Sequence, residues 1–180
     1  MASPFLEESL CVLARTPATF NLLLRDLPEA WTTANEGPGT WSPYVIIGHL
    51  IHGEKTDWMT RLEIILEHGL NRPFDPFDRE AQFNEITDTP LATLLDEFAT
   101  LRRQNLARLR QLDLQPEQLE LKGTHPALGT VTVRQLLATW TAHDLSHILQ
   151  VSRVMAKRYK HEVGPWAQYL SVMSSSNGPQ

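Results

Sequence analysis

Apolar residues recur at spacings of three, four and seven positions along most of this chain, which is the period of an amphipathic α-helix. In chain order, the stretches with this pattern are residues 4–15, 16–27, 44–69, 91–112 and 133–159. Thr16-Pro17 separates the first two, and Ser42-Pro43 precedes the third; both pairs are typical helix starts. The pattern therefore predicts four helical segments, of which the first is broken.

The apolar positions of the three long stretches define the expected core. In chain order they are Ile47, Ile51, Trp58, Leu62 and Ile65, then Leu91, Leu94, Leu95, Phe98, Leu101 and Leu109, then Val133, Leu136, Trp140, Val151 and Val154. No alternating run of β-branched residues is long enough to predict a sheet. We expect an all-α four-helix bundle that forms a single domain over residues 1–173, with a short outer helix within 162–173 and a disordered tail at 174–180.

Two long connections interrupt the helical pattern, at residues 71–90 and 112–131. Connections of this length often act as lids or cross between distant ends of a bundle. The first carries Phe74, Phe77 and Phe83. These side chains could anchor the loop in the core, or they could form the wall of an apolar substrate pocket.

Composition limits the classes of function. The hydrophobic fraction of 42% and the charged fraction of 21% are ordinary for a globular protein, and the net charge of -5 gives no reason to expect binding to nucleic acid or an anionic membrane. The densest basic run, Arg102 to Arg110, lies on one predicted helix, and we interpret it as a solvated face.

The sequence also allows predictions about the location of the protein and about its cysteine chemistry. No apolar stretch approaches the roughly 20 residues that span a bilayer, and the N-terminus does not resemble a signal peptide, so we expect a cytoplasmic protein. Cys11 is the only cysteine, which excludes an internal disulfide and a metal site with several thiolates.

Two histidines in the stretch TAHDLSHIL stand four residues apart on a predicted helix. His143 and His147 lie on the apolar stripe, and residues at this spacing project from one face about one turn apart. A buried imidazole without a partner costs about 1–3 kcal/mol. The pair is therefore either hydrogen bonded within the core or bound to a metal ion, which needs a third ligand from another histidine or a carboxylate.

His49 and His52 are rival third ligands in the second helical segment. At about 100° per residue, His52 lies beside the apolar arc, whereas His49 lies well away from its centre. His49 suits a site only in a solvent-open groove between helices. Gly48 costs about 1 kcal/mol relative to alanine in a helix, which is understandable if another helix or a ligand must come close.

A set of motifs in chain order resembles the DinB-like (DinB/YfiT-like) superfamily of metalloenzymes. The motifs are Thr16-Pro17, then WSPYVIIGHL at residues 41–50, then HPALGTVTVRQLLATWTAHDLSHILQVSRV at residues 125–154. The likeness covers residues 16–169. It implies a four-helix bundle in up-down-down-up order, a homodimer, and a divalent metal held by His49, His143 and His147.

The resemblance also implies an activity. Characterised members of the superfamily transfer low-molecular-weight thiols to electrophiles or isomerise maleylpyruvate, and three neutral histidines leave metal positions open for such chemistry. We therefore expect a metal-dependent enzyme with a small-molecule substrate, a thiol-dependent S-transferase or a related hydrolase or isomerase. Zn²⁺ or Ni²⁺ is the expected ion, with Fe²⁺ or Mn²⁺ as alternatives, and a low-molecular-weight thiol is the expected cosubstrate.

The alternative is a non-catalytic stress-response module, with a structural metal or none. A structural zinc site is normally closed by four protein ligands, and His52 or Glu54 could supply the fourth. Asp144, next to His143, points about 100° away from it. His52 and Asp144 are candidates to contact the ligands from a second layer, although we expect Asp144 to be solvated. No residue stands out as an activated nucleophile or general base.

Overall fold

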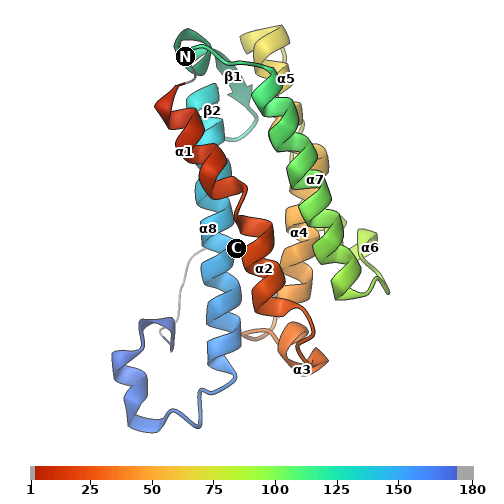
Figure 1. The fold of residues 1–180 in the computed structure, drawn as a ribbon, viewed down its shortest axis with the longest axis vertical. Helices are drawn as coiled ribbons and strands as arrows, with labels where there is room; N and C mark the ends of the chain where they lie inside the picture. Colours follow the sequence, from red (N-terminus) through yellow and green to blue (C-terminus); the bar gives the residue numbers. More distant parts are fainter. Residues whose placement is uncertain (1–2, 174–180) are drawn as a thin grey trace.

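The computed structural model describes residues 3–173, and long helices form most of it (Figure 1). The predicted tail at 174–180 lies outside the described residues. The bundle consists of α1 (Pro4–Leu13) with α2 (Thr16–Leu24), α4 (Pro43–Thr56) with α5 (Trp58–His68), α7 (Leu91–Gln111), and α8 (Val133–Lys157). The short α3 (Glu29–Thr32) joins the first two pairs. The predicted all-α bundle and its broken first segment are confirmed.

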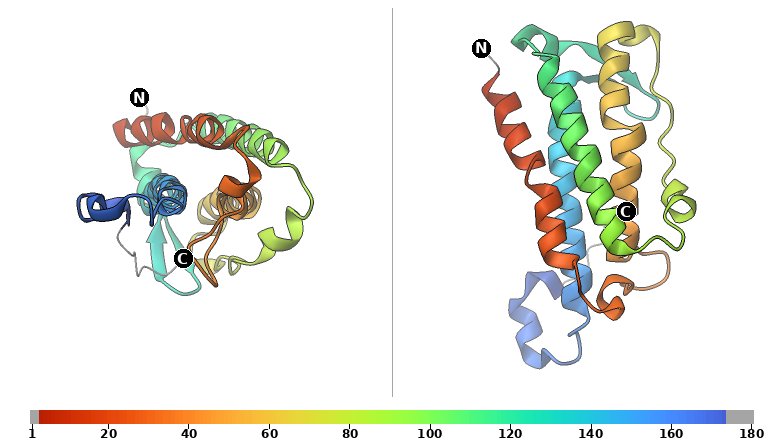
Figure 2. Two further views of the ribbon diagram at one scale, coloured as in Figure 1. Left: turned by 90° about the horizontal axis from the view of Figure 1, so that it is seen from below. Right: turned by 45° about the vertical axis from the view of Figure 1, so that its right-hand side comes forward.

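The order of helix directions is up-down-down-up. In Figure 1, α1 and α2 run in one direction, α4, α5 and α7 all run in the other, and α8 returns in the direction of α1. Because α5 and α7 are parallel, their connection must traverse the length of the bundle. This crossover contains η1 (Gly69–Asn71) and α6 (Ala81–Glu85), and α6 lies alongside α4 (Figure 2).

Side-chain caps begin two of the helices that carry histidines. The hydroxyl of Ser42 accepts a hydrogen bond from the Val45 amide at 3.3 Å, with Pro43 in the first turn of α4. The hydroxyl of Thr132 accepts from the Gln135 amide, and the Gln135 side chain accepts from the Thr132 amide, so α8 begins with a capping box. These caps satisfy amide groups that lack partners in the first turn of a helix.

Two predictions about the helices need correction. The segment predicted as one helix over 44–69 is two, α4 and α5, because Asp57 leaves helical geometry with φ −108 and ψ −76. The outer helix expected within 162–173 is instead two 3-10 turns, η3 (Gly164–Tyr169) and η4 (Ser171–Met173). The apolar periodicity continues through Asp57, so the sequence pattern did not reveal the break.

A short β-hairpin was also missed. After η2 (Pro116–Glu120), β1 (Lys122–His125) pairs antiparallel with β2 (Gly129–Thr132), and Gly123 lies opposite Val131. A Cβ atom on Gly123 would lie 2.6 Å from Ile65 Cγ1, so glycine is required for the hairpin to pack against α5. Strands of four residues are too short to display a period of two in the sequence.

The buried apolar residues form two clusters. One joins α1, α5, the second half of α7 and the first half of α8. The other joins α2, α4, the first half of α7 and Val151 of α8. The predicted core residues are buried, except that Leu91 and Leu101 are partly exposed. Several buried polar side chains accompany them, including His49, His147, Arg102 and Asp144. None of the helices within residues 3–173 is long and apolar enough to cross a membrane.

Candidate metal centre

Three histidine rings from two helices converge inside the bundle. Nε2 of His143 on α8 lies 3.0 Å from Nε2 of His49 on α4 and 3.0 Å from Nε2 of His147 one turn further along α8. The possible ligand atoms of all three lie within 4.8 Å of one another. Among the described residues, no other group of three or more histidine, cysteine or acidic residues is gathered in this way.

The structure brings His49, and not His52, together with the two histidines of α8, and it corrects the argument from the angular positions of the residues on α4. Every residue of α4 from 46 to 54 is buried, because α7, α8 and α6 all pack against this helix. A helical-wheel projection, which places residues at 100° intervals, assumes that only one face of the helix is buried. At the level of His49, however, α4 has no face exposed to solvent. His49 is 7% exposed, so it lies in a covered site and not in the open groove that we expected.

Gly48 explains how α6 can approach α4 so closely. A Cβ atom at this position would lie 2.7 Å from Cδ1 and 2.8 Å from Cγ2 of Ile86, which directly follows α6. Of the two reasons given for this glycine, another helix or a ligand that must come close, the structure shows the first. The close approach covers the side of α4 next to His49.

The chemistry of the three rings fits a cation. Each Nε2–Nε2 contact has room for one proton, and a neutral His143 can donate its single proton to only one of its two neighbours. An ion with Zn–N bonds of about 2.1 Å places adjacent ligand atoms about 3.0–3.4 Å apart, which is close to the observed separation. Hydrogen bonds cannot satisfy this arrangement fully, whereas one divalent ion can.

The surroundings keep the rings neutral, as metal ligands must be. Burial, followed by the charge of His147, lowers the pKa of His49 to about 3. The same two causes, in the same order, lower the pKa of His143 to about 2. Burial also lowers the pKa of His147. At neutral pH all three imidazoles therefore keep a lone pair available.

Gln150 orients His147 and was not predicted from the sequence. Its Oε1 lies 2.8 Å from Nδ1 of His147, so Nδ1–H donates to it and Nε2 keeps the lone pair that faces the other rings. The spacing of three residues on α8 could have indicated this contact.

Nδ1 of His49 and Nδ1 of His143 are buried without a hydrogen-bond partner in the described part of the chain. A buried polar atom without a hydrogen-bond partner lowers the free energy of unfolding, because it loses its hydrogen bond to water on folding.

Aromatic side chains wall the centre. The Trp41 ring lies 4.8 Å from that of His49, and the Trp58 ring lies 5.1 Å from that of His143. From the crossover, Phe77 packs edge-on against His49 at 5.4 Å. Of the three crossover phenylalanines, Phe77 thus belongs to the wall, Phe74 is buried in the core, and Phe83 is 48% exposed.

A buried ionic network lies beside the centre, and it corrects two predictions. Arg102 is 1% exposed and not part of a solvated face. Its guanidinium donates to the carboxylates of Glu54 and Asp144 and to the carbonyl of Leu13, which uses all five of its N–H donors. Asp144 is therefore paired inside the bundle, and not solvated as expected. Burial lowers the pKa of His147, and the hydrogen bond to Gln150 and the charge of Asp144 oppose that lowering only in part.

Neither expected fourth ligand joins the three histidines. Nδ1 of His52 lies 2.9 Å from Oε1 of Glu85 on α6. Glu54 accepts hydrogen bonds from Arg102, Asn105 and Trp140. Within residues 3–173 the group of possible ligands therefore has three protein members, which is typical of a catalytic site and not of a closed structural one.

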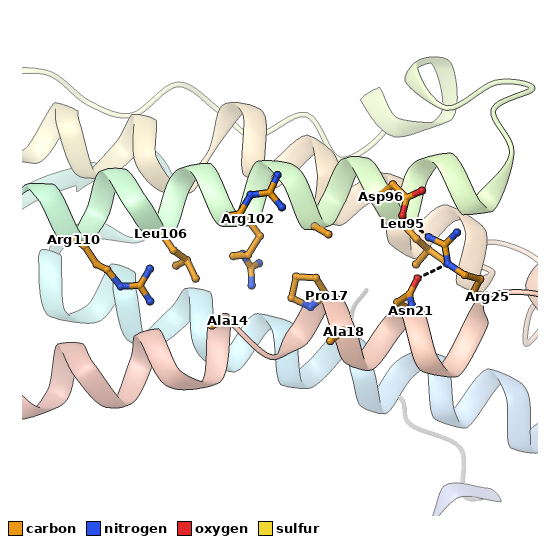
Figure 3. Close-up of a pocket in the computed structure, with 12 residues that line it drawn as sticks. Ala14, Pro17, Ala18, Asn21, Arg25, Leu95, Asp96, Arg102, Leu106 and Arg110 are labelled. Carbon is orange, nitrogen blue, oxygen red and sulfur yellow. Dashed lines mark hydrogen bonds and ion pairs between the residues drawn. The ribbon is translucent and has the colours of Figure 1, made fainter.

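A separate groove of about 580 Å³ runs between α2 and α7 (Figure 3). Pro17 and Ala18 line one side, and at one end Arg25 contacts both Asn21 and Asp96. Arg102 also borders this groove, but its donors are already used within the bundle. Among the described residues that line the groove there is no histidine, so the groove is separate from the candidate metal centre.

Comparison with known proteins identifies the family and the fold. The family model of the DinB superfamily matches residues 13–151. Among solved structures, one from Bacillus subtilis, YfiT, matches with a TM-score of 0.74 and 19% identity, over 88% of this chain and 90% of the other. YfiT is described as a probable metal-dependent hydrolase with an unusual four-helix bundle topology. No curated protein matches the sequence. The chain belongs to the DinB superfamily.

Proposed function

We propose that this protein is a divalent-metal-dependent enzyme in which His49, His143 and His147 hold the ion. The observation that carries the proposal is the mutual approach of three Nε2 atoms from α4 and α8. Three imidazole ligands leave coordination positions for a nucleophile or substrate. When bound, the ion would lower the pKa of a water or thiol, or polarise a carbonyl. Zn²⁺ or Ni²⁺ suits imidazole ligands.

We infer that the reaction is the transfer of a low-molecular-weight thiol to an electrophile on a small molecule. The aromatic wall formed by Trp41, Trp58 and Phe77 supports an apolar substrate. Trp58 also lines a cavity of about 190 Å³ between α5, α8 and the hairpin, which suits a small ligand. Hydrolysis is the second candidate, favoured by the description of YfiT.

One experiment tests metal dependence and separates the two reactions. The purified protein is loaded with Zn²⁺ or Ni²⁺ and assayed for conjugation of N-acetylcysteine to monochlorobimane, and separately for hydrolysis of p-nitrophenyl acetate. Thiol transfer predicts turnover of the first probe, and loss of that turnover in His143→Ala and His147→Ala. Turnover of only the ester would support the hydrolase. Reaction rates that do not change in the two variants would show that the metal takes no part in the reaction.

We also propose that the protein forms a homodimer, as the sequence analysis predicted. Leu145 and Leu149, one turn apart on α8, are 51% and 60% exposed. Exposed apolar strips of this kind are common in subunit interfaces. Sedimentation equilibrium of the wild type and of Leu145→Lys/Leu149→Lys checks it, and a wild type that remains monomeric at high concentration would contradict it.

A further inference from the structure

A second histidine next to the centre is not among its ligands. His52 follows His49 by three residues on α4, so the two side chains lie one turn apart on neighbouring faces. Its side chain is 8% exposed, and Nδ1 lies 2.9 Å from Oε1 of Glu85. The Phe77 ring packs against both imidazoles, at 5.0 Å from His52 and 5.4 Å from His49. His52 therefore shares an aromatic wall with the candidate metal centre.

The contact with Glu85 determines which nitrogen of His52 is available. A carboxylate accepts the Nδ1 proton, which leaves the lone pair on Nε2. Among residues 3–173 the imidazole of His52 has no second hydrogen-bond partner, and Nε2 is not one of the buried unpartnered atoms. A carboxylate on Nδ1 also stabilises the imidazolium that forms when Nε2 takes up a proton. His52 thus has the features of a general base.

We propose that His52 is the catalytic proton acceptor of this site and that Glu85 is its positioning residue. This inference rests on the proposed function. Nε2 of His52 takes the proton from the water or thiol as that nucleophile bonds to the electrophilic carbon. The leaving group departs with its bonding electron pair. A basic leaving group, such as an alkoxide, then receives the same proton from His52, whereas chloride leaves as the free anion and His52 returns its proton to solvent. His52 is neutral before and after the reaction and cationic between the two steps, while Glu85 stays anionic.

The crossover is what brings this pair together. Glu85 ends α6, and Phe77 precedes α6 in the same connection. When α6 packs against α4, it therefore brings Glu85 into contact with His52. The same packing places Phe77 in the aromatic wall. A purely structural role, as a tie between α4 and α6, would need the contact but would not need a free lone pair on Nε2.

The kinetic test uses three variants of the zinc-loaded full chain. His52→Gln removes the base, and Glu85→Gln removes the charge while keeping an acceptor oxygen. Glu80→Gln, an exposed carboxylate of the same crossover, is the control. With monochlorobimane and N-acetylcysteine, or with p-nitrophenyl acetate, we expect kcat to fall about 10²–10⁴-fold in His52→Gln and at least about tenfold in Glu85→Gln. Zinc stoichiometry, measured by elemental analysis, should not change in any variant.

Long-range ¹H–¹⁵N correlation spectra provide a readout that does not depend on turnover. In the zinc-loaded wild type, His52 should carry its proton on Nδ1 and have no metal on Nε2. A proton or zinc on Nε2 would overturn the assignment, as would full activity in His52→Gln. A wild type that turns over neither probe with any metal would instead overturn the proposed function, and with it the role of His52.

Discussion

Nε2 of His49 lies 3.0 Å from Nε2 of His143, although 94 positions separate the two residues in the sequence. His143 is also the ring that contacts His147, so it is the middle member of the three. We therefore expect His143→Ala to abolish stoichiometric Zn²⁺ binding, whereas His68→Ala, at the exposed end of α5, leaves it intact. Elemental analysis after dialysis measures the ratio of metal to chain. One tightly held zinc ion in His143→Ala would contradict the site.

Gln150 should tune the metal affinity without being a ligand. Gln150→Leu removes the acceptor that holds Nδ1–H of His147, and loss of such a partner typically costs about 10–100-fold in affinity. The control is Gln104→Leu, an exposed position on α7. Competition with a chromophoric chelator measures the dissociation constant. Equal affinities in the two variants would show that Gln150 does not orient the ring.

Acid should destabilise the metal-free protein below about pH 6.5. The pKa values of His49 and His143 are about 3 and about 2 in the folded chain, against 6.5 in the unfolded chain. Below pH 6.5 the unfolded state therefore binds more protons than the folded state, and the free energy of unfolding decreases as the pH decreases. Burial raises the pKa of Asp57 to about 6, which acts in the opposite direction. Between pH 7 and pH 5 we expect a net loss of about 2 kcal/mol from these groups.

Urea unfolding at the two pH values checks this dependence. The control is the double variant His49→Gln/His143→Gln, in which the contributions of these two histidines are absent and those of His147 and Asp57 remain. Because His147 and Asp57 act in opposite directions, the stability of this variant should fall much less than that of the wild type on acidification. A wild type and a double variant that lose the same stability would show that the buried histidines are not responsible.

Arg102 should be far more important for folding than its neighbour in the sequence. Arg102→Met leaves the carboxylates of Glu54 and Asp144 buried without their cation, which typically costs about 3–5 kcal/mol. Arg103→Met alters an exposed side chain of similar size and should change the stability by no more than about 0.5 kcal/mol. Denaturant midpoints at pH 7 compare the two variants. Similar midpoints would indicate that the network contributes little.

The features that the sequence determined depend on contacts within one segment. Helical periodicity predicted the long helices and nearly all of their buried apolar positions, because one amphipathic helix repeats its pattern every turn. The spacing of His143 and His147 placed both on one face of α8 for the same reason. Residue motifs shared with the DinB superfamily indicated His49 as their partner, which periodicity alone did not.

Only the tertiary structure decided how separate segments meet. His49 is buried beside His143 and His147 because α6 and α8 cover α4 from several sides, and the apolar period of α4 alone does not contain that information. Arg102 and Asp144, both expected at the surface, are buried because α7 and α8 bring opposite charges together with Glu54. The pairing of His52 with Glu85 depends likewise on where the crossover docks. Local periodicity encodes which face of a helix is apolar, whereas the contacts between helices are set by the packing of distant segments.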